Sequence, residues 1–312
     1  MAEFSDAELF GRTLGFMGAP QTLDLARAKA AVLGVPFDCG VNPLRIGSRL
    51  GPAAIREQSL QLRPYNSELA DFNPLQRLGV VDCGDVRVVP SRVVDAFERI
   101  EAAARRIHEA GAVPITMGGD GSVSLPLLRA AARRHRGIAA VHIDAHTDSY
   151  PYAPDDKYNT STQFTHAAQE QLVSASLSYH IGVRGTTYAA GVYDFTRGLG
   201  YNVITMRELM KRGIDDVLAE LQQKLAGRPV YLCWDMDAFD PSVAPGVATP
   251  SWGGLLAREG LELLRGLAGL DLVAVDVNTV SPPHDVQGTT ASLAAQVMYE
   301  GMVLLCRQLG LA

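Results

Sequence analysis

The sequence lacks the features that mark membrane-spanning, secreted or nucleic-acid-binding proteins. Among its 312 residues there is no apolar run long enough to cross a bilayer, and Met1–Gly18 has neither a basic segment nor the apolar stretch of a signal peptide. The net charge of −6 argues against nucleic acid as the main partner. We therefore expect a cytoplasmic protein that binds neither membranes nor nucleic acid.

Cysteine is scarce, and the chain shows no sign of division. The four cysteines are widely separated and never in C-x-x-C spacing, which favours reduced thiols over a disulfide framework. No Ser/Gly-rich linker, internal repeat or low-complexity tract interrupts the sequence. We expect one domain over residues 1–312, with residues 1–28 as an N-terminal extension packed on it.

Short apolar runs alternate with helical patterns along the chain. The predicted strands are Ala30–Val35, Leu78–Cys83, Val113–Met117, Ile138–Ile143, Ser178–Val183, Val230–Trp234 and Leu272–Val277. The predicted helices are Pro52–Leu62, Ser91–Glu109, Ser122–Arg134, Thr205–Ala226, Ala257–Leu267 and Thr290–Leu309. Such alternation predicts an α/β domain whose mostly parallel central sheet has helices on both faces. Ligands of these sheets bind beyond the carboxyl ends of the strands.

Two acidic segments follow predicted strands at that edge. Asp144, His146 and Asp148 alternate along the chain, so an extended backbone could direct them to one point. Two carboxylates and an imidazole suit Mn²⁺, Ni²⁺, Fe²⁺ or Zn²⁺. The alternative is a solvated acidic loop with a hydrogen-bonded histidine.

The second acidic segment makes that alternative less attractive. Asp235 and Asp237 repeat the i, i+2 spacing, and two unpaired carboxylates there would repel each other unless a cation or hydrogen bonds compensate. A metal centre shared by both segments is the simplest explanation. The polar segments Met117–Ser122 and Asp276–Pro283 also follow strands, but their spacing is not diagnostic.

Taken together, these segments resemble the ureohydrolase family of arginases, agmatinases and other guanidino-acid hydrolases. The Asp-x-His-x-Asp motif and the later Asp-x-Asp-x-x-Asp-Pro motif occur in the family's order. Further similarity covers most of the chain, in the segments Gly34–Asp38, Gly47–Arg56, Asp82–Val86, Ile181–Arg184, Ala244–Pro250 and Gly253–Leu255.

The resemblance implies a three-layer αβα domain, usually trimeric or hexameric, that holds two Mn²⁺ or Ni²⁺ ions. In the family a hydroxide between the metals attacks a guanidinium carbon and releases urea. By similarity, Asp144 and Asp235 should bridge both metals, and His146 and Asp237 should complete one site. Asp148 should serve the other metal and contact the hydroxide, which makes it the candidate catalytic residue.

Three positions depart from the family pattern. The family's Gly-Gly-Asp-His-Ser motif supplies a histidine ligand to the second metal, and this chain has Gly121 there. A histidine for proton transfer is replaced by Thr160, and a carboxylate that faces the guanidinium is replaced by Thr279. Loss of a general acid or base alone lowers rates roughly 10²–10⁴-fold.

Two interpretations follow from these departures. The chain resembles the degenerate partner in heteromeric ureohydrolases such as metformin hydrolase, which would make it a nearly inert subunit of an active paralogue's assembly. Alternatively it is an active hydrolase with altered specificity for a small cationic guanidine-type substrate. In either case the divalent metal, Mn or Ni, could fill one position only or be absent.

Overall fold

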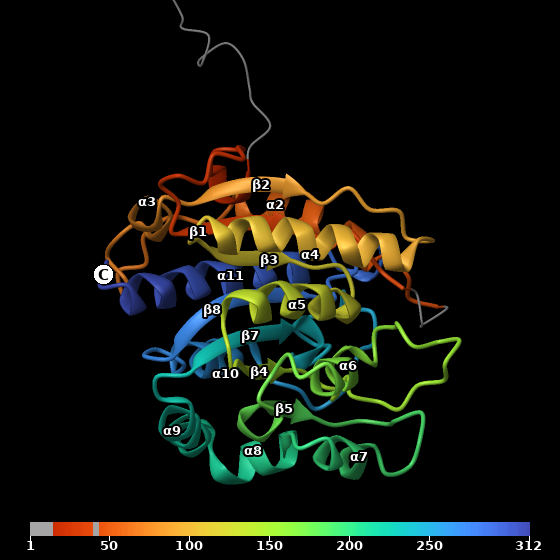
Figure 1. Ribbon diagram of the computed structural model, residues 1–312. Coiled ribbons are helices and arrows are strands. Elements are labelled where there is room, and N and C mark those ends of the chain that lie inside the picture. Colours follow the sequence, from red (N-terminus) through yellow and green to blue (C-terminus); the bar gives the residue numbers. More distant parts are fainter. Residues whose placement is uncertain (1–14, 40–43) are drawn as a thin grey trace, which may run out of the picture.

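The computed structural model describes residues 15–39 and 44–312, and the described residues form a single α/β domain built on one sheet. Its eight strands lie in the order β2-β1-β3-β8-β7-β4-β5-β6 (Figure 1). Their bounds are β1 Ala30–Gly34, β2 Val81–Asp85, β3 Val113–Met117, β4 Ala139–Ile143, β5 Tyr179–Val183, β6 Asn202–Thr205, β7 Pro229–Asp235 and β8 Asp271–Asn278. Every neighbouring pair is parallel, which confirms the predicted fold class.

Helices cover both faces of this sheet, so the domain has three layers (Figure 1). The helices are α2 Gly51–Ser59, α3 Pro74–Leu78, α4 Val93–Glu109, α5 Ser124–Arg134, α6 Gln163–Gln169, α7 Val192–Gly198, α8 Met206–Arg212, α9 Ile214–Leu225, α10 Ala257–Arg265 and α11 Thr289–Gln308. Helices α4, α5 and α6 pack together on one face, and α2, α11 and α10 pack on the other.

The two layers of helices bury two separate apolar clusters. Tyr231 of β7 belongs to the cluster beneath α4 and α5, with Phe97 and Leu128. The next residue, Leu232, belongs to the opposite cluster, with Met298 of α11. Because successive side chains of a strand point to opposite faces, a continuous apolar strand serves both layers at once.

Several predicted elements differ in extent from the observed ones, and two of these differences have a clear structural reason. Leu78 ends helix α3, where Asn73 caps the first turn and Gly79 adopts a left-handed conformation, so strand β2 begins only at Val81. The single predicted helix Thr205–Ala226 is two helices, because Gly213 at φ 86° and ψ 153° separates α8 from α9.

Three further elements were not predicted. Strand β6 has only four residues and lies at the sheet edge, and α6 and α7 have seven residues each. Elements of this length carry little periodicity in the sequence. Of these, α6 matters most, because it begins at the candidate site.

The proposed N-terminal extension is described only in part, since residues 1–14 lie outside the described residues. Phe16 is fully buried, and its backbone N–H donates to Oδ2 of Asp82 at 2.9 Å. This part of the segment therefore packs on the sheet. Among the described helices, none is both long and apolar enough to traverse a bilayer.

Candidate metal centre

Four central strands bring the predicted site residues to one edge of the sheet. The adjacent strands β3, β8, β7 and β4 supply these residues: Gly121, Thr279 and Asp144 follow β3, β8 and β4, and Asp235 is the last residue of β7. Strand β4 comes after β3 in the chain but lies three positions away from it, so the order of the sheet switches here. Such switch points create a crevice in which ligands of open α/β sheets bind.

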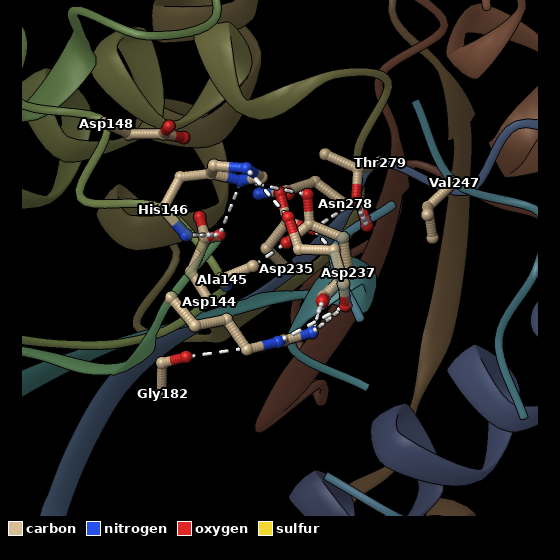
Figure 2. A network of polar contacts seen from close by, with 12 residues as sticks. Asp144, Ala145, His146, Asp148, Gly182, Asp235, Asp237, Val247, Asn278 and Thr279 are labelled. Carbon is tan, nitrogen blue, oxygen red and sulfur yellow. Dashed lines mark hydrogen bonds and ion pairs between the residues drawn. The ribbon is translucent and has the colours of Figure 1, made fainter. Parts of the chain in front are cut away.

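Three side chains converge at the ends of β4 and β7 (Figure 2). Nδ1 of His146 lies 3.1 Å from Oδ2 of Asp237 and 3.4 Å from Oδ1 of Asp144. Donor atoms that share a cation at about 2.1 Å in neighbouring octahedral positions lie about 3 Å apart. The spacing of these three side chains therefore suits a divalent cation.

Backbone hydrogen bonds hold these carboxylates in place. Oδ1 of Asp144 accepts from the N–H of His146 at 2.6 Å, and Oδ1 of Asp235 accepts from the N–H of Asp237 at 2.7 Å. The N–H of Ala145 donates to Oδ1 of Asp237 at 3.1 Å and so links the two loops. The i, i+2 spacing thus produces two tight turns that support each other.

Asp144 is completely buried, so the contacts of both its carboxylate oxygens matter. Its Oδ2 accepts no well-directed hydrogen bond within the part of the chain that the structure describes, and it lies 2.8 Å from Nε2 of His142. A buried carboxylate oxygen without a directed donor is costly unless a cation compensates it. The imidazole of His142 or a bound cation can compensate this oxygen.

The electrostatics of the cluster agree with that interpretation. Burial and then the neighbouring carboxylates Asp237 and Asp144 raise the pKa of Asp235 well above its ordinary value. Burial opposes the charge on His146, but Asp237 and Asp144 nevertheless raise its pKa well above normal. Burial likewise opposes ionisation of Asp144, yet the imidazoles of His142 and His146 lower its pKa. Without a cation, this cluster would therefore retain protons at positions where carboxylates usually ionise.

Asp148 belongs to a second, overlapping group of donor atoms. His142, Asp144 and Asp148 offer donor atoms within 4.8 Å of one another, as do Asp144, His146 and Asp237. Asp148 has a positive φ of 48°, which is uncommon for a residue other than glycine, and it stands to one side of the contacts drawn in Figure 2. Burial and then Asp144 raise its pKa well above normal.

The side chain that contacts Asp148 is Gln163, the first residue of α6. Its Nε2 donates a hydrogen bond to Oδ2 of Asp148, and Gln163 is almost completely buried. Gly121 faces the same place, because a Cβ built on it would lie 2.9 Å from Oδ2 of Asp148 and 3.3 Å from Oγ1 of Thr160. The structure thus brings Gly121, Asp148 and Thr160 together.

Thr279 also lies in the site, at the end of β8. Its φ is +66°, and its hydroxyl donates to Oδ1 of Asp235. A pocket of about 200 Å³ opens above these residues. Its lining is His146, Asp148, Asp235, Asp237, Thr160 and Thr279, together with Tyr150, Ser161, Thr186, Thr187, Tyr188, Ala248 and Thr249.

Two residues of the site were not singled out in the sequence. His142 precedes Asp144 by two positions, so the alternation that identified Asp144, His146 and Asp148 extends one step back to it. Gln163 gave no signal, because α6 was not predicted and a glutamine carries no charge.

Comparison with known proteins identifies the family of this chain. The model of the arginase family matches residues 28–304, which is most of the chain. This chain belongs to the arginase family. The ureohydrolase resemblance of the sequence is thereby confirmed.

Relatives of this arginase-family chain are named as hydrolases of guanidino compounds. It is 38% identical to a guanidinobutyrase from Pseudomonas aeruginosa over 90% of this chain and 88% of the relative, and 36% identical to the mitochondrial guanidino acid hydrolase of Homo sapiens over 92% and 79%. Among solved structures, it is similar to proclavaminate amidino hydrolase from Streptomyces clavuligerus, with a TM-score of 0.90, 33% identity, and coverage of 96% of this chain and 98% of that one.

Proposed function

We propose that this chain is a catalytically impaired ureohydrolase-family subunit, which acts with an active paralogue in hydrolysis of a guanidino or biguanide compound to urea, or a substituted urea, and an amine. The observation that carries this proposal is the environment of Asp148. Its carboxylate faces Gly121 and the amide of Gln163, where the family resemblance implies an imidazole.

The pocket above the site supports the same proposal. Thr160 and Thr279 line it, and their hydroxyls are too weakly basic to replace an imidazole or a carboxylate in proton transfer. His146 is the one imidazole in the described lining, and its Nδ1 is directed at Asp144 and Asp237. The described walls therefore offer no second imidazole that could move a proton to a leaving amine.

The retained residues still fit a divalent cation, Mn²⁺ or Ni²⁺. Asp144, His146, Asp235 and Asp237 would hold it, and when bound it would supply Lewis acidity and lower the pKa of water. The chain's own carboxylates at the pocket floor would attract the positively charged guanidinium and orient it. We further propose an assembly of trimeric or hexameric form that includes the paralogue, in the manner of metformin hydrolase, and a cytoplasmic location.

A second candidate function is an active hydrolase with altered specificity. What favours it is the similarity to relatives named guanidinobutyrase and guanidinopropionase, both 38% identical to this chain. With Thr279 in place of a carboxylate, the pocket would suit a guanidine that is substituted or less cationic at that point. Asp148 would then be the catalytic carboxylate.

Urea release by the purified chain distinguishes the two functions. The isolated chain, loaded with Mn²⁺ or Ni²⁺, is expected to release no urea from guanidino acids, agmatine or biguanides, whereas an active relative assayed in parallel does. Co-expression with a paralogue from the same host should yield a stoichiometric complex that releases urea. Robust turnover by the isolated chain would refute the impaired-subunit proposal and support the second function.

A further inference from the structure

The side chain of Gln163 fills the space that a residue larger than glycine would need at position 121. A Cβ built on Gly121 would lie 2.6 Å from Nε2 of Gln163, closer than real Cβ contacts allow. The same Cβ would lie 2.9 Å from Oδ2 of Asp148. A side chain at position 121 would therefore extend toward Asp148 through the place where the Gln163 amide now lies.

Gln163 is held there by its own helix. It is only 1% exposed, and it begins α6 directly after Thr162. The next residue, Phe164, donates its backbone N–H to the carbonyl oxygen of Asp148 at 2.9 Å. A backbone hydrogen bond and the side chain of Gln163 thus both join the start of α6 to Asp148.

The chemistry of this contact opposes a cation at Asp148. The amide N–H of Gln163 donates to Oδ2 of Asp148, so its positive end already lies on the carboxylate oxygen that a metal would need. The other amide atom, Oε1, accepts no hydrogen bond within the described residues, so only the contact with Asp148 orients the amide. A cation bound to Asp148 would have to displace this donor or rotate it.

A second neutral donor is found on Asp235. The hydroxyl of Thr279 donates to Oδ1 of Asp235, the same oxygen that accepts the N–H of Asp237. Asp144 belongs to both overlapping donor groups, and its Oδ2 lies 2.8 Å from Nε2 of His142. A side-chain amide donor therefore occupies the Asp148 group, whereas in the His146 group Nδ1 of His146 lies within 3.4 Å of Asp144 and Asp237, at the spacing of ligands that share a cation.

We propose that Gln163 closes the second cation position of this site, so that the chain binds one divalent ion at Asp144, His146, Asp235 and Asp237. This inference rests on the proposed metal site but not on the proposed partner, because it concerns the number of ions on the isolated chain. The missing side chain at Gly121 and the buried amide of Gln163 together close this position. Replacing Gly121 with histidine alone is then not enough for a second ion to bind.

The test is the number of Mn²⁺ ions that the full-length chain binds. Wild type, Gly121→His, Gln163→Ala and the double variant Gly121→His/Gln163→Ala are freed of metal with a chelator, reloaded with Mn²⁺ and desalted. Bound metal is counted by elemental analysis. Electron paramagnetic resonance shows whether the bound Mn²⁺ is mononuclear or exchange-coupled to a second ion.

We expect one mononuclear ion per chain in wild type and in both single variants, and two coupled ions only in the double variant. Two ions in wild type that fall to one in Gln163→Ala would overturn the proposal, since Gln163 would then be a ligand through Oε1. Two ions in Gly121→His alone would also overturn it.

The isosteric variant Gln163→Glu guards against a double variant that fails to fold. It keeps the shape of the side chain and replaces the N–H donor with a carboxylate oxygen, so binding of a second ion should become measurable. A count of one in this variant contradicts the proposal. None of these ion counts depends on urea release. The proposed function can therefore be wrong while this inference is correct, and this inference can be wrong while the proposed function is correct.

Discussion

The candidate site consists of two halves that differ in how their carboxylates are compensated. In the His146 half, formed by Asp144, His146, Asp235 and Asp237, Nδ1 of His146 lies 3.1 Å from Asp237 and 3.4 Å from Asp144. In the Asp148 half, formed by Gly121, Asp148, Thr160 and Gln163, a neutral amide contacts the carboxylate directly.

The difference shows how a metal position can be lost without unfolding the site. Loss of a ligand leaves a buried carboxylate that must be protonated, paired or hydrogen-bonded. In the Asp148 half, Gln163 supplies the hydrogen bond, and the space left by a missing side chain at Gly121 accommodates it. The His146 half keeps its ligands, and among the described residues its carboxylates accept backbone N–H groups and the Thr279 hydroxyl but no side-chain amide. A cation should therefore matter there most.

The largest expected difference is between two single variants, each of which removes one carboxylate from one half. Asp237→Asn should lower Mn²⁺ affinity by at least about 100-fold. Loss of a residue that only orients a metal ligand already lowers affinity about 10–100-fold, and loss of the ligand itself should lower it more. Asp148→Asn should lower it by less than about 10-fold, since Gln163 already holds that carboxylate. Isothermal titration of the metal-free variants measures both. Equal losses would remove the distinction between the halves.

A smaller effect is expected from the residue behind Asp144. His142 lies with Nε2 2.8 Å from Oδ2 of Asp144, and its Nδ1 is 2.9 Å from Nδ1 of His180. His142→Gln should reduce Mn²⁺ affinity roughly 10–100-fold, because His142 contacts the metal ligand Asp144 and orients it.

The matched control for that variant is His108→Gln. His108 is also buried, but it lies in α4 and contacts the ring of His135. The Mn²⁺ dissociation constant should not change in this variant. A similar loss in both variants would mean that His142 acts only through the packing of the domain.

The two halves also differ in how far the sequence could predict them. Asp144, His146, Asp235 and Asp237 share i, i+2 spacing after apolar strands, and parallel strands gather such ends at one edge, so the His146 half follows from local pattern and topology. The central strands themselves were predictable because strands buried on both faces are continuously apolar.

Gln163 could not be predicted in the same way. Its role depends on the start of α6, a seven-residue helix without periodicity, and on a tertiary contact with a loop 15 residues earlier. The breaks at Gly79 and Gly213 were missed for a related reason. Each glycine ends a helix through its backbone conformation, and the apolar pattern continues past it.

The pH dependence of stability provides a third test, which covers both halves because the pKa of Asp148 is raised as well. Burial and neighbouring carboxylates raise the pKa values of Asp235 and Asp237, and Asp237 and Asp144 raise that of His146. A raised pKa in the folded state gives stability that is present at low pH and lost as pH rises through the folded value. The metal-free protein should therefore lose stability as pH rises from the ordinary carboxyl range toward neutrality.

Mn²⁺ binds the deprotonated ligands, so its stabilising effect should grow over the same range. At a concentration of 100 times the dissociation constant the gain is about 2.7 kcal/mol, which raises the melting temperature by several degrees. The pKa of Asp144 is lowered, so this residue adds stability to the metal-free protein as pH rises, but only below the ordinary carboxyl range. Melting curves with and without Mn²⁺ between about pH 5 and pH 8 measure the difference. In Asp237→Asn the difference should be small at every pH.

The smallest effect is expected at Thr279, whose hydroxyl lies on the boundary between the halves. Thr279→Val keeps the shape of the side chain but removes the donor to Oδ1 of Asp235. The free energy of unfolding of the metal-free protein should fall by about 1 kcal/mol, because Asp235 retains its second donor, the N–H of Asp237. Thr279→Ser keeps the hydroxyl and should lose less than about half of that in urea denaturation. If valine and serine cost the same, the hydroxyl does not compensate Asp235, and of the two neutral side-chain donors, Thr279 and Gln163, only Gln163 remains.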